Sequence, residues 1–456
     1  MAKYKAYPEY KETRLGWLAE IPAHWDAKKL KYLGQAIIGL TYSPDDVVNE
    51  AEGTLVLRSS NVQNGNLDFS DNVYVTKKIP FQLKVKENDI LICARNGSRA
   101  LIGKNARITK EAEGMSFGAF MSIFRSHYNN YLSKVFNSAL FEYQSGSFLT
   151  ATINQLTTSN LNSFEIPLPP KEERDHIVHF LEHETAKIDN LIEKQQQLIE
   201  MIKEKRQAVI SHAVTKGLNP DVPMKDSGVE WLGEVPDHWD KIKLKHITRK
   251  IIDAEHKTAP YFDDGEYLVC RTTNVKNGKL YLEGGLYTDQ NTYNEWIKRG
   301  KPESGDILFT REAPAGEACV YSGDIPLCLG QRMVLFKLEK NRVVPEFVLH
   351  SIYSGLSDDF VKQLSQGSTV SHFNMSDIQN LPLYEPPLCE QKEIKEYLEC
   401  NLSKHDNLIV SAQDMISLMQ ERRTALISAA VTGKIDVRGW VAPDTQDIEE
   451  SQEVNA

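Results

Sequence analysis

Apolar residues recur at heptad spacing between Lys171 and about Thr215, in a stretch that contains no proline or glycine. The two apolar seams of this stretch are formed by Leu181, Ile188, Ile202 and Val209 and by Ile177, Leu191 and Leu198. Such spacing predicts one continuous amphipathic helix, roughly 65 Å long at ~1.5 Å per residue. A second stretch near the C-terminus repeats the pattern with Ile394, Leu398, Leu408, Met415, Met419 and Leu426.

Each of these helices has the other as its expected partner. Polar residues interrupt the seams at Gln195, Lys205, His405 and Arg422. The pairing is therefore expected to be only moderately stable by itself, unless these positions face something else. An ordinary packed helix within each domain remains the alternative, although it would be long against the ~10–14 residue average.

The sequence before each helix predicts a globular domain of short strands. Apolar runs at 54–57, 89–92, 267–269 and 306–309 are typical of β-strands. The dipeptides Asn64-Gly65 and Asn277-Gly278 predict hairpin turns. The proline pairs at 169–170 and 386–387 end each domain and mark the point where the helix begins.

The whole pattern occurs twice. The lead-in at 17–26 (WLAEIPAHWD) returns at 231–240 (WLGEVPDHWD), and 58–65 (RSSNVQNG) returns at 271–278 (RTTNVKNG). The sequence thus predicts an α+β protein with two mixed α/β domains, separated by two long antiparallel coiled-coil helices and related by a pseudo-twofold internal repeat. The expected segments are 1–170 for the first domain with its lead-in, 171–216 for the central helix, 217–387 for the second domain, 388–436 for the C-terminal helix and 437–456 for an acidic disordered tail.

Composition and charge limit the kind of protein this can be. Apolar and charged contents of 41% and 25% are typical of a soluble globular protein. No apolar run approaches the ~20 residues of a membrane helix, and the N-terminus carries no signal-peptide core. The six cysteines have no zinc spacing and indicate a reducing cytoplasm. A net charge of −10 counts against a protein that coats nucleic acid, so any nucleic-acid surface must be local.

Catalytic and cofactor motifs are not found in the sequence. It has no glycine-rich phosphate loop, no dinucleotide fingerprint and no His-Glu-x-x-His zinc motif. The repeated His24 and His238 stand in a Pro-x-His-Trp turn, where a structural role is expected. We therefore expect no catalytic residue and no metal site in this chain.

The repeated lead-in, the Asp-Ile-Leu strand at 89–91 and 306–308, and the Pro-Pro…Glu-Gln…Ile run that opens the helix at 386–394 resemble the DNA-specificity subunits of type I restriction–modification systems. The resemblance reaches to about Trp440. It implies two target-recognition domains, each of which reads one half of an asymmetric interrupted site in double-stranded DNA, with the helices setting the spacing. It further implies two methyltransferase subunits docked on the helices and two motor-nuclease subunits. S-adenosylmethionine, ATP and Mg²⁺ would then belong to those partners, with no cofactor in this chain.

Base edges and phosphates are contacted mainly by Arg, Lys, Asn, Gln, Ser, Thr and His side chains in loops. The candidates in the first domain are Arg58, Ser60, Asn61, Asn64, Arg95, Asn96, Ser98, Arg99 and Lys104. Those in the second domain are Arg271, Thr273, Asn274, Lys276, Asn277, Arg311, Gln331, Arg332, Ser368 and His372. Where the copies agree, a shared scaffold role is the competing interpretation. Where they differ, as 96–99 (NGSR) does from 312–315 (EAPA), unequal half-sites would require the difference, although the second domain lacks a matching arginine-rich run.

Three alternatives remain open at this stage. The chain could be the accessory specificity subunit of a fused nuclease–methyltransferase system, which shares this architecture. It could be a coiled-coil scaffold whose heads bind other proteins, which predicts no sequence-selective DNA binding. It could also be an unrecognised nuclease, which Mg²⁺-dependent cutting by the chain alone would reveal.

Overall fold

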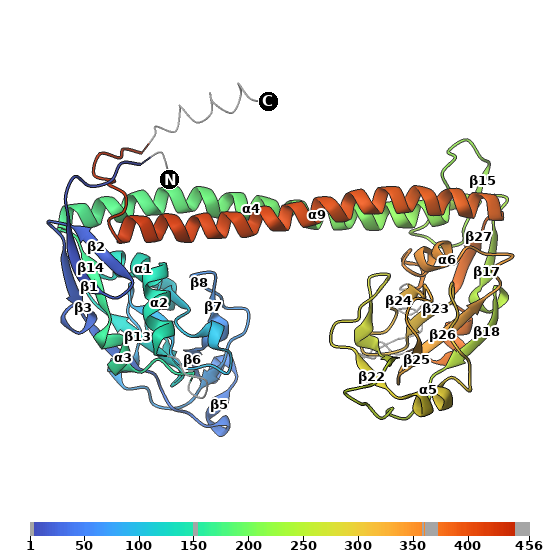
Figure 1. Ribbon diagram of the computed structural model, residues 1–456, viewed down its shortest axis with the longest axis horizontal. Coiled ribbons are helices and arrows are strands. Elements are labelled where there is room, and N and C mark those ends of the chain that lie inside the picture. Colours follow the sequence, from blue (N-terminus) through green and yellow to red (C-terminus); the bar gives the residue numbers. More distant parts are fainter. Residues whose placement is uncertain (1–3, 149–153, 358–359, 361–372, 443–456) are drawn as a thin grey trace. The chain divides into compact units, whose positions relative to one another are not determined.

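The computed structural model describes residues 4–148, 154–357, 360 and 373–442. The chain forms two compact units, each composed of one domain and parts of two long helices (Figure 1). Unit 1 comprises Met1–Gln195 and Asp414–Ala456, and unit 2 comprises Gln196–Gln413. Both long helices are therefore divided between the units.

The long helices begin and end where local backbone chemistry requires it. Helix α4 (Lys171–Lys216) has 46 residues and helix α9 (Leu388–Val431) has 44, and each starts directly after a proline pair. Gly217 and Gly433 follow their ends with φ of +74° and +75°, a left-handed conformation that stops a helix. The sequence predicted a C-terminal helix over 388–436, and this prediction was wrong at its end because α9 stops at Val431.

The two helices run antiparallel within each unit. In unit 1, Arg423 of α9 forms an ion pair with Asp189 of α4 at 2.7 Å, and Ile427, one turn further along α9, packs in the same cluster as the earlier Leu181. In unit 2, the equivalent pair joins Arg206 to Asp406 at 3.3 Å. The long helices and the α+β class are confirmed, with the same helix contact in both copies.

Only part of the predicted heptad seams is buried. Ile177 and Leu181 at the start of α4 are fully buried, as are Ile394 and Leu398 at the start of α9. Nearer the centre of α4, Ile188 and Ile202 are also buried, whereas four other predicted seam residues are exposed: Leu191, Leu198, Leu408 and Met415. The prediction was wrong for these four because they occupy equivalent positions of the helix repeat on its outward face.

An acidic residue in the first turn of each long helix holds the aromatic lead-in. Glu173 is buried and accepts hydrogen bonds from Trp25 Nε1 at 2.9 Å and from His24 Nε2 at 2.7 Å. Glu390 accepts the equivalent bonds from Trp239 and His238, at 2.9 and 2.8 Å. The repeated Trp-His motif is therefore structural, as expected.

Two small sheets form the domain of unit 1. The lead-in pairs β1 (Tyr10–Leu15) with β2 (Leu18–Pro22) and β3 (Asp26–Lys29) with β14 (Glu165–Leu168). An antiparallel sheet has the order β11 (Asn105–Arg107), β10 (Ile90–Cys93), β13 (Met121–Arg125), β4 (Gln35–Ile38). A second sheet has the order β12 (Ser116–Phe117), β6 (Thr54–Leu57), β9 (Tyr74–Val75), β5 (Val47–Val48). The hairpin β7 (Val62–Gln63) to β8 (Asn66–Leu67) and the helices α1 (Asn129–Phe136), α2 (Ala139–Ser147) and α3 (Thr158–Ser163) complete it.

The domain of unit 2 repeats this plan. Its lead-in pairs β15 (Met224–Asp226) with β16 (Glu234–Pro236) and β17 (Asp240–Lys243) with β27 (Pro382–Glu385). One sheet has the order β18 (Thr248–Asp253), β26 (Met333–Leu338), β23 (Ile307–Thr310), β24 (Ala318–Val320). The other has the order β22 (Leu286–Thr288), β19 (Tyr267–Cys270), β25 (Leu327–Leu329). The hairpin β20 (Val275–Lys276) to β21 (Lys279–Leu280) and the helices α5 (Gln290–Trp296), α6 (Pro345–Ile352) and α8 (Met375–Gln379) complete it.

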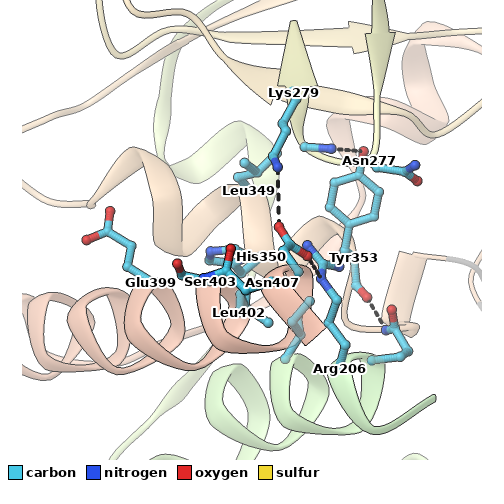
Figure 2. A pocket seen from close by; sticks show the side chains of 14 residues that line it. Arg206, Asn277, Lys279, Leu349, His350, Tyr353, Glu399, Leu402, Ser403 and Asn407 are labelled. Atoms are coloured by element: carbon cyan, nitrogen blue, oxygen red, sulfur yellow. Dashed lines mark hydrogen bonds and ion pairs between the residues drawn. The ribbon is translucent and has the colours of Figure 1, made fainter. Parts of the chain in front are cut away.

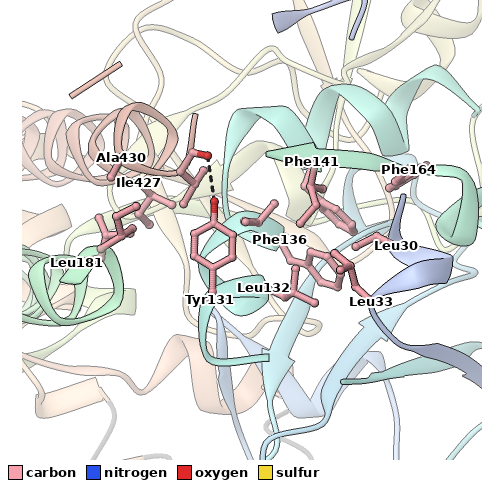
Figure 3. Packing of buried hydrophobic residues seen from close by; sticks show 14 of the residues in the cluster. Leu30, Leu33, Tyr131, Leu132, Phe136, Phe141, Phe164, Leu181, Ile427 and Ala430 are labelled. Atoms are coloured by element: carbon pink, nitrogen blue, oxygen red, sulfur yellow. Dashed lines mark hydrogen bonds between the residues drawn. The ribbon is translucent and has the colours of Figure 1, made fainter. Parts of the chain in front are cut away.

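The core of unit 1 includes the end of the chain. Figure 3 shows Tyr131 of α1 directed towards the end of α9, where its hydroxyl donates a hydrogen bond to the Val431 carbonyl at 3.2 Å. Beyond the helix, Val437 is buried and Trp440 packs against Phe180 of α4. Val437 and Trp440 therefore belong to the folded unit and not to the expected acidic tail, because their side chains pack in its core, whereas Val441 is exposed. The rest of that tail, 443–456, lies outside the described residues.

Within the described ranges, no helix combines the length and the apolar character that crossing a bilayer requires.

Candidate nucleic-acid interface

A cleft of about 680 Å³ opens in unit 1 where two parallel strands end. Strands β6 and β12 pair in parallel, and the Gly118 amide donates a hydrogen bond to the Leu57 carbonyl at 3.0 Å. The chain therefore leaves both strands on the same side. This surface, here called cleft 1, is bordered by Arg58, Ser59, Ser60, Asp71, Ala119 and Phe120.

Polar loop residues converge on cleft 1. Arg58 forms an ion pair with Asp71 at 2.8 Å, and the Arg95 guanidinium lies over the Phe120 ring, 5.3 Å from its centroid. The Asn96 amide donates a hydrogen bond, at 3.3 Å, to the hydroxyl of the residue that follows Arg58. The structure thus brings four of the predicted residues together: Arg58, Ser60, Arg95 and Asn96.

Unit 2 has the equivalent surface, here called cleft 2. Strands β19 and β25 pair in parallel, and the Gly330 amide donates a hydrogen bond to the Cys270 carbonyl at 2.7 Å. Two hollows of about 220 and 240 Å³ lie beyond the strand ends, and both are lined by Gln331 and Arg332. The predicted residues that border cleft 2 are Arg271, Thr273, Arg311, Gln331 and Arg332.

Backbone hydrogen bonds establish which residues of the two clefts are equivalent. The Ala94 amide donates to the Phe120 carbonyl at 2.9 Å, and the Arg311 amide donates to the Arg332 carbonyl at 2.8 Å, each directly after the equivalent strand. Arg311 therefore occupies the position of Ala94, and Arg332 occupies that of Phe120. The position of Arg95 is taken in the second domain by Glu312, so the second domain has no counterpart to that arginine.

Arg311 and Arg332 make different contacts. Arg311 turns inward, where it pairs with Asp253 at 2.9 Å and donates to the Phe373 carbonyl at 2.9 Å. Arg332 is exposed, has a left-handed backbone with φ of +68°, and pairs with Glu312 at 2.7 Å. Arg332 is thus an outward-facing cation of cleft 2, as Arg95 is of cleft 1.

The repeated asparagines Asn61 and Asn274 are buried and bonded to the backbone. The side-chain oxygen of Asn61 accepts from the Arg58 amide at 2.9 Å, and its amide group donates to the Asp68 carbonyl at 2.9 Å. Asn274 accepts from the Arg271 amide at 3.0 Å in the same manner. Neither side chain can contact DNA in this conformation, because both are buried and hold the turn that follows the strand.

The hairpin turns lie away from the clefts. Asn64 and Asn277 each have a left-handed φ of +51°, as an Asn-Gly turn requires. Lys104 in unit 1 donates a hydrogen bond to Gln63 of the hairpin at 3.3 Å, and Lys276 is exposed beside the turn in unit 2.

The hairpin of unit 2 ends against the helix segments of that unit, at a groove of about 490 Å³ (Figure 2). Lys279 of the hairpin pairs with Asp406 of α9 at 3.2 Å, and Asp406 also pairs with Arg206 of α4. His350 of α6 lines the same groove, where burial, and to a lesser degree Arg206, lowers its pKa to about 4. The ion pairs beside this groove attach the domain of unit 2 to its helix segments.

The remaining predicted residues divide into two groups. Ser98 and Arg99 are exposed on the loop that follows Asn96, and the Arg99 guanidinium donates a hydrogen bond to the Gly146 carbonyl at 3.3 Å. Ser368 and His372 lie outside the described residues.

Sequence reasoning missed Phe120 and Asp71, and aligning 117–121 (FGAFM) with 329–333 (LGQRM) would have pointed to the first of them.

Metal binding and thiol chemistry are not indicated in the described part of the chain. It contains no group of three or more His, Cys, Asp or Glu residues that could hold a metal ion. Cys270, Cys319 and Cys328 are buried, and burial raises the pKa of each thiol, to about 12 for Cys319 and Cys328. These thiols are structural.

Exposed apolar side chains lie on the helix segments of both units. In unit 2 they are Leu198, Met201, Leu408 and Val410, and in unit 1 they are Leu191, Met415 and Leu418. In the helix repeat, Leu191 corresponds to Leu408, Leu198 to Met415 and Met201 to Leu418. Apolar residues that recur at exposed positions of a repeat indicate a surface that something covers.

The chain is similar to known proteins over most of its length. A family model for the type I restriction modification DNA specificity domain matches residues 22–201 and 236–409. The chain is 23% identical to the specificity subunit of the type I restriction enzyme StySPI from Salmonella potsdam, over 93% of this chain and 91% of that protein. It is also 23% identical to the EcoKI specificity subunit from Escherichia coli strain K12, over the same shares.

A solved structure from work on complex assembly and conformational transition of the type I R-M system has the same fold. It aligns with a TM-score of 0.64 at 14% identity and covers 91% of this chain and 99% of that one.

Proposed function

Because the chain belongs to the family of type I restriction–modification DNA specificity subunits, we propose that it reads a bipartite site in double-stranded DNA, one half through each cleft. The observation that carries this proposal is the occurrence of two equivalent clefts, built on the same pair of parallel strands, whose side chains differ. Equivalent positions let both domains approach DNA in the same way. Different side chains let them select different bases.

The DNA-contacting residues of the proposal are those of the clefts and their rims. In unit 1 they are Arg58, Ser60, Arg95, Asn96, Ser98 and Arg99, and in unit 2 they are Arg271, Thr273, Gln331 and Arg332. Lys104 and Lys276 are placed to contact phosphates beside them, while Asn64, Asn277 and Arg311 support the loops. The net charge of −10 is compatible with this, because the cations that contact DNA are concentrated at two surfaces.

The proposal includes partners that do the chemistry. Two methyltransferase subunits would cover the exposed apolar positions of the helices, and two motor-nuclease subunits would join them, all in the cytoplasm with the DNA. S-adenosylmethionine, ATP and Mg²⁺ would be bound by those subunits and not by this chain. The repeat of the exposed apolar positions supports two equivalent docking events, because each methyltransferase would meet the same helix surface.

Mapping methylated adenines in a genome tests the proposal. The chain is co-expressed with its methyltransferase, and the expected result is one motif with two specified parts and a fixed gap of unspecified bases. Replacing the domain of unit 2 with one of another specificity should change only one part. A single uninterrupted motif, or a motif that domain exchange leaves unaltered, would contradict it.

A further inference from the structure

Phe120 and Arg332 occupy the same position of the repeat in the two clefts, and there an apolar side chain is exchanged for a cation. Each residue follows the strand that pairs in parallel with β6 or β19, and each carbonyl accepts a hydrogen bond from the residue that follows the neighbouring strand, Ala94 or Arg311. The two side chains therefore start from equivalent residues of the fold, although only Arg332 has a left-handed φ.

Phe120 exposes a large apolar side chain to solvent. It is 60% exposed, and its ring carries the Arg95 guanidinium on one face. The cleft beside it is also lined by Leu40, Val47 and Val73. A phenylalanine has no hydrogen-bond donor or acceptor on its side chain, so it can distinguish bases only by apolar contact.

Arg332 presents a planar set of donors at that position. Its side chain is 54% exposed and is held by the ion pair with Glu312, and exposed ion pairs of this kind exchange readily for other partners. An arginine in the major groove donates two hydrogen bonds to O6 and N7 of guanine, while an apolar side chain contacts the 5-methyl group of thymine.

We propose that Phe120 selects a thymine in the first half-site through its 5-methyl group and that Arg332 selects a guanine in the second through O6 and N7. The same position of the repeat thus makes the two half-sites unequal. This inference rests on the proposed function, and it adds the residue and the base that carry one element of specificity in each half.

Base analogues test the two contacts separately, in DNA binding by the complex of this chain with its methyltransferase. Uracil lacks the 5-methyl group of thymine. Replacing each thymine of the first half-site by uracil should weaken wild-type binding about threefold to fourfold at one position, as expected for one buried methyl group. Phe120→Ala should bind thymine and uracil equally at that position.

The second contact is tested with 7-deazaguanine, which lacks the N7 acceptor. One such replacement in the second half-site should weaken wild-type binding, and Arg332→Ala should be insensitive to it. Arg332→Ala should also relax the preference for guanine at that position by about 5- to 150-fold. Arg332→Lys is the matched control: it retains the charge and a donor but not the planar pair of donors, so it should keep most of the affinity and weaken the preference for guanine less than Arg332→Ala does.

The unaltered half-site is an internal control for folding, since each variant should read it as the wild type does. If the bipartite motif is found but neither analogue effect depends on its residue, the inference is wrong and the proposed function stands. A first half-site without thymine, or a second without a G·C pair, would also overturn the inference. If no bipartite motif is found, the proposed function itself fails.

Discussion

At the residue scale, the two copies of the repeat show how one fold position serves different roles. Asn61 and Asn274 are identical because each caps the same short turn with its buried amide. Phe120 and Arg332 differ although each carbonyl accepts a hydrogen bond from the residue that follows the same neighbouring strand. The asparagines thus belong to the shared scaffold, whereas the position of Phe120 and Arg332 can vary without loss of the fold.

His350 should make the free energy of unfolding of unit 2 depend on pH. Its folded pKa of about 4 lies below the ordinary 6.5 because burial, and to a lesser degree the charge of Arg206, disfavours the protonated imidazole. As pH falls below 6.5 the unfolded chain binds a proton at His350 and the folded chain does not, until pH approaches 4. The free energy of unfolding of unit 2 should thus fall by about 1–2 kcal/mol between pH 7 and pH 5 through this residue.

Urea unfolding of wild type and His350→Gln at both pH values measures this contribution. The loss between pH 7 and pH 5 should be smaller in the variant by that amount. Equal losses in the two proteins would show that His350 does not titrate as the structure indicates.

At the element scale, the start of each long helix is fixed to its domain by one glutamate. Glu173 is only 6% exposed and accepts bonds from Trp25, His24 and the Tyr7 hydroxyl. Glu390 is 34% exposed and, within the described part of the chain, accepts side-chain bonds from Trp239 and His238 alone. The same motif is therefore more deeply buried in unit 1 than in unit 2.

Replacing each glutamate by alanine should affect the two units unequally. Glu173→Ala leaves two buried donors, the Tyr7 hydroxyl and the Trp25 indole, without an acceptor and should destabilise unit 1 by about 3 kcal/mol, whereas Glu390→Ala should cost unit 2 about 1 kcal/mol. Amide hydrogen exchange resolves the two units in one experiment. Equal effects, or a larger effect in unit 2, would show that burial does not set the strength of this contact.

At the scale of the whole molecule, the repeat and its long helices could be predicted from sequence, and the family resemblance is confirmed. Heptad spacing, proline pairs and the doubled lead-in each depend on local rules, and α4 begins and ends at the predicted residues. The clefts could not be derived in this way. Arg58 and Phe120 meet only because β6 and β12 pair in parallel, and that pairing is invisible in the spacing of residues.

The residue ranges of the two units predict which unit a C-terminal truncation would unfold. A chain that stops at residue 413 retains all of unit 2 and loses Ile427, Ala430 and Val437 from the core of unit 1. Hydrogen exchange should then show unit 2 protected and the domain of residues 4–168 largely unprotected, although the deletion is at the opposite end of the sequence. A chain that stops at 442 is the control and should retain protection in both units. Loss of protection in unit 2 instead would contradict the division.

Unit 1 contains both ends of the sequence and unit 2 its middle, and this arrangement sets the order in which the two units can fold during synthesis. Unit 2 is one continuous stretch, so it can fold as soon as the ribosome has released residue 413, whereas the domain that is translated first must wait for the last apolar residues of the chain. The N-terminal domain would therefore complete its core last, and chaperones would meet its exposed apolar surface for nearly the whole period of translation.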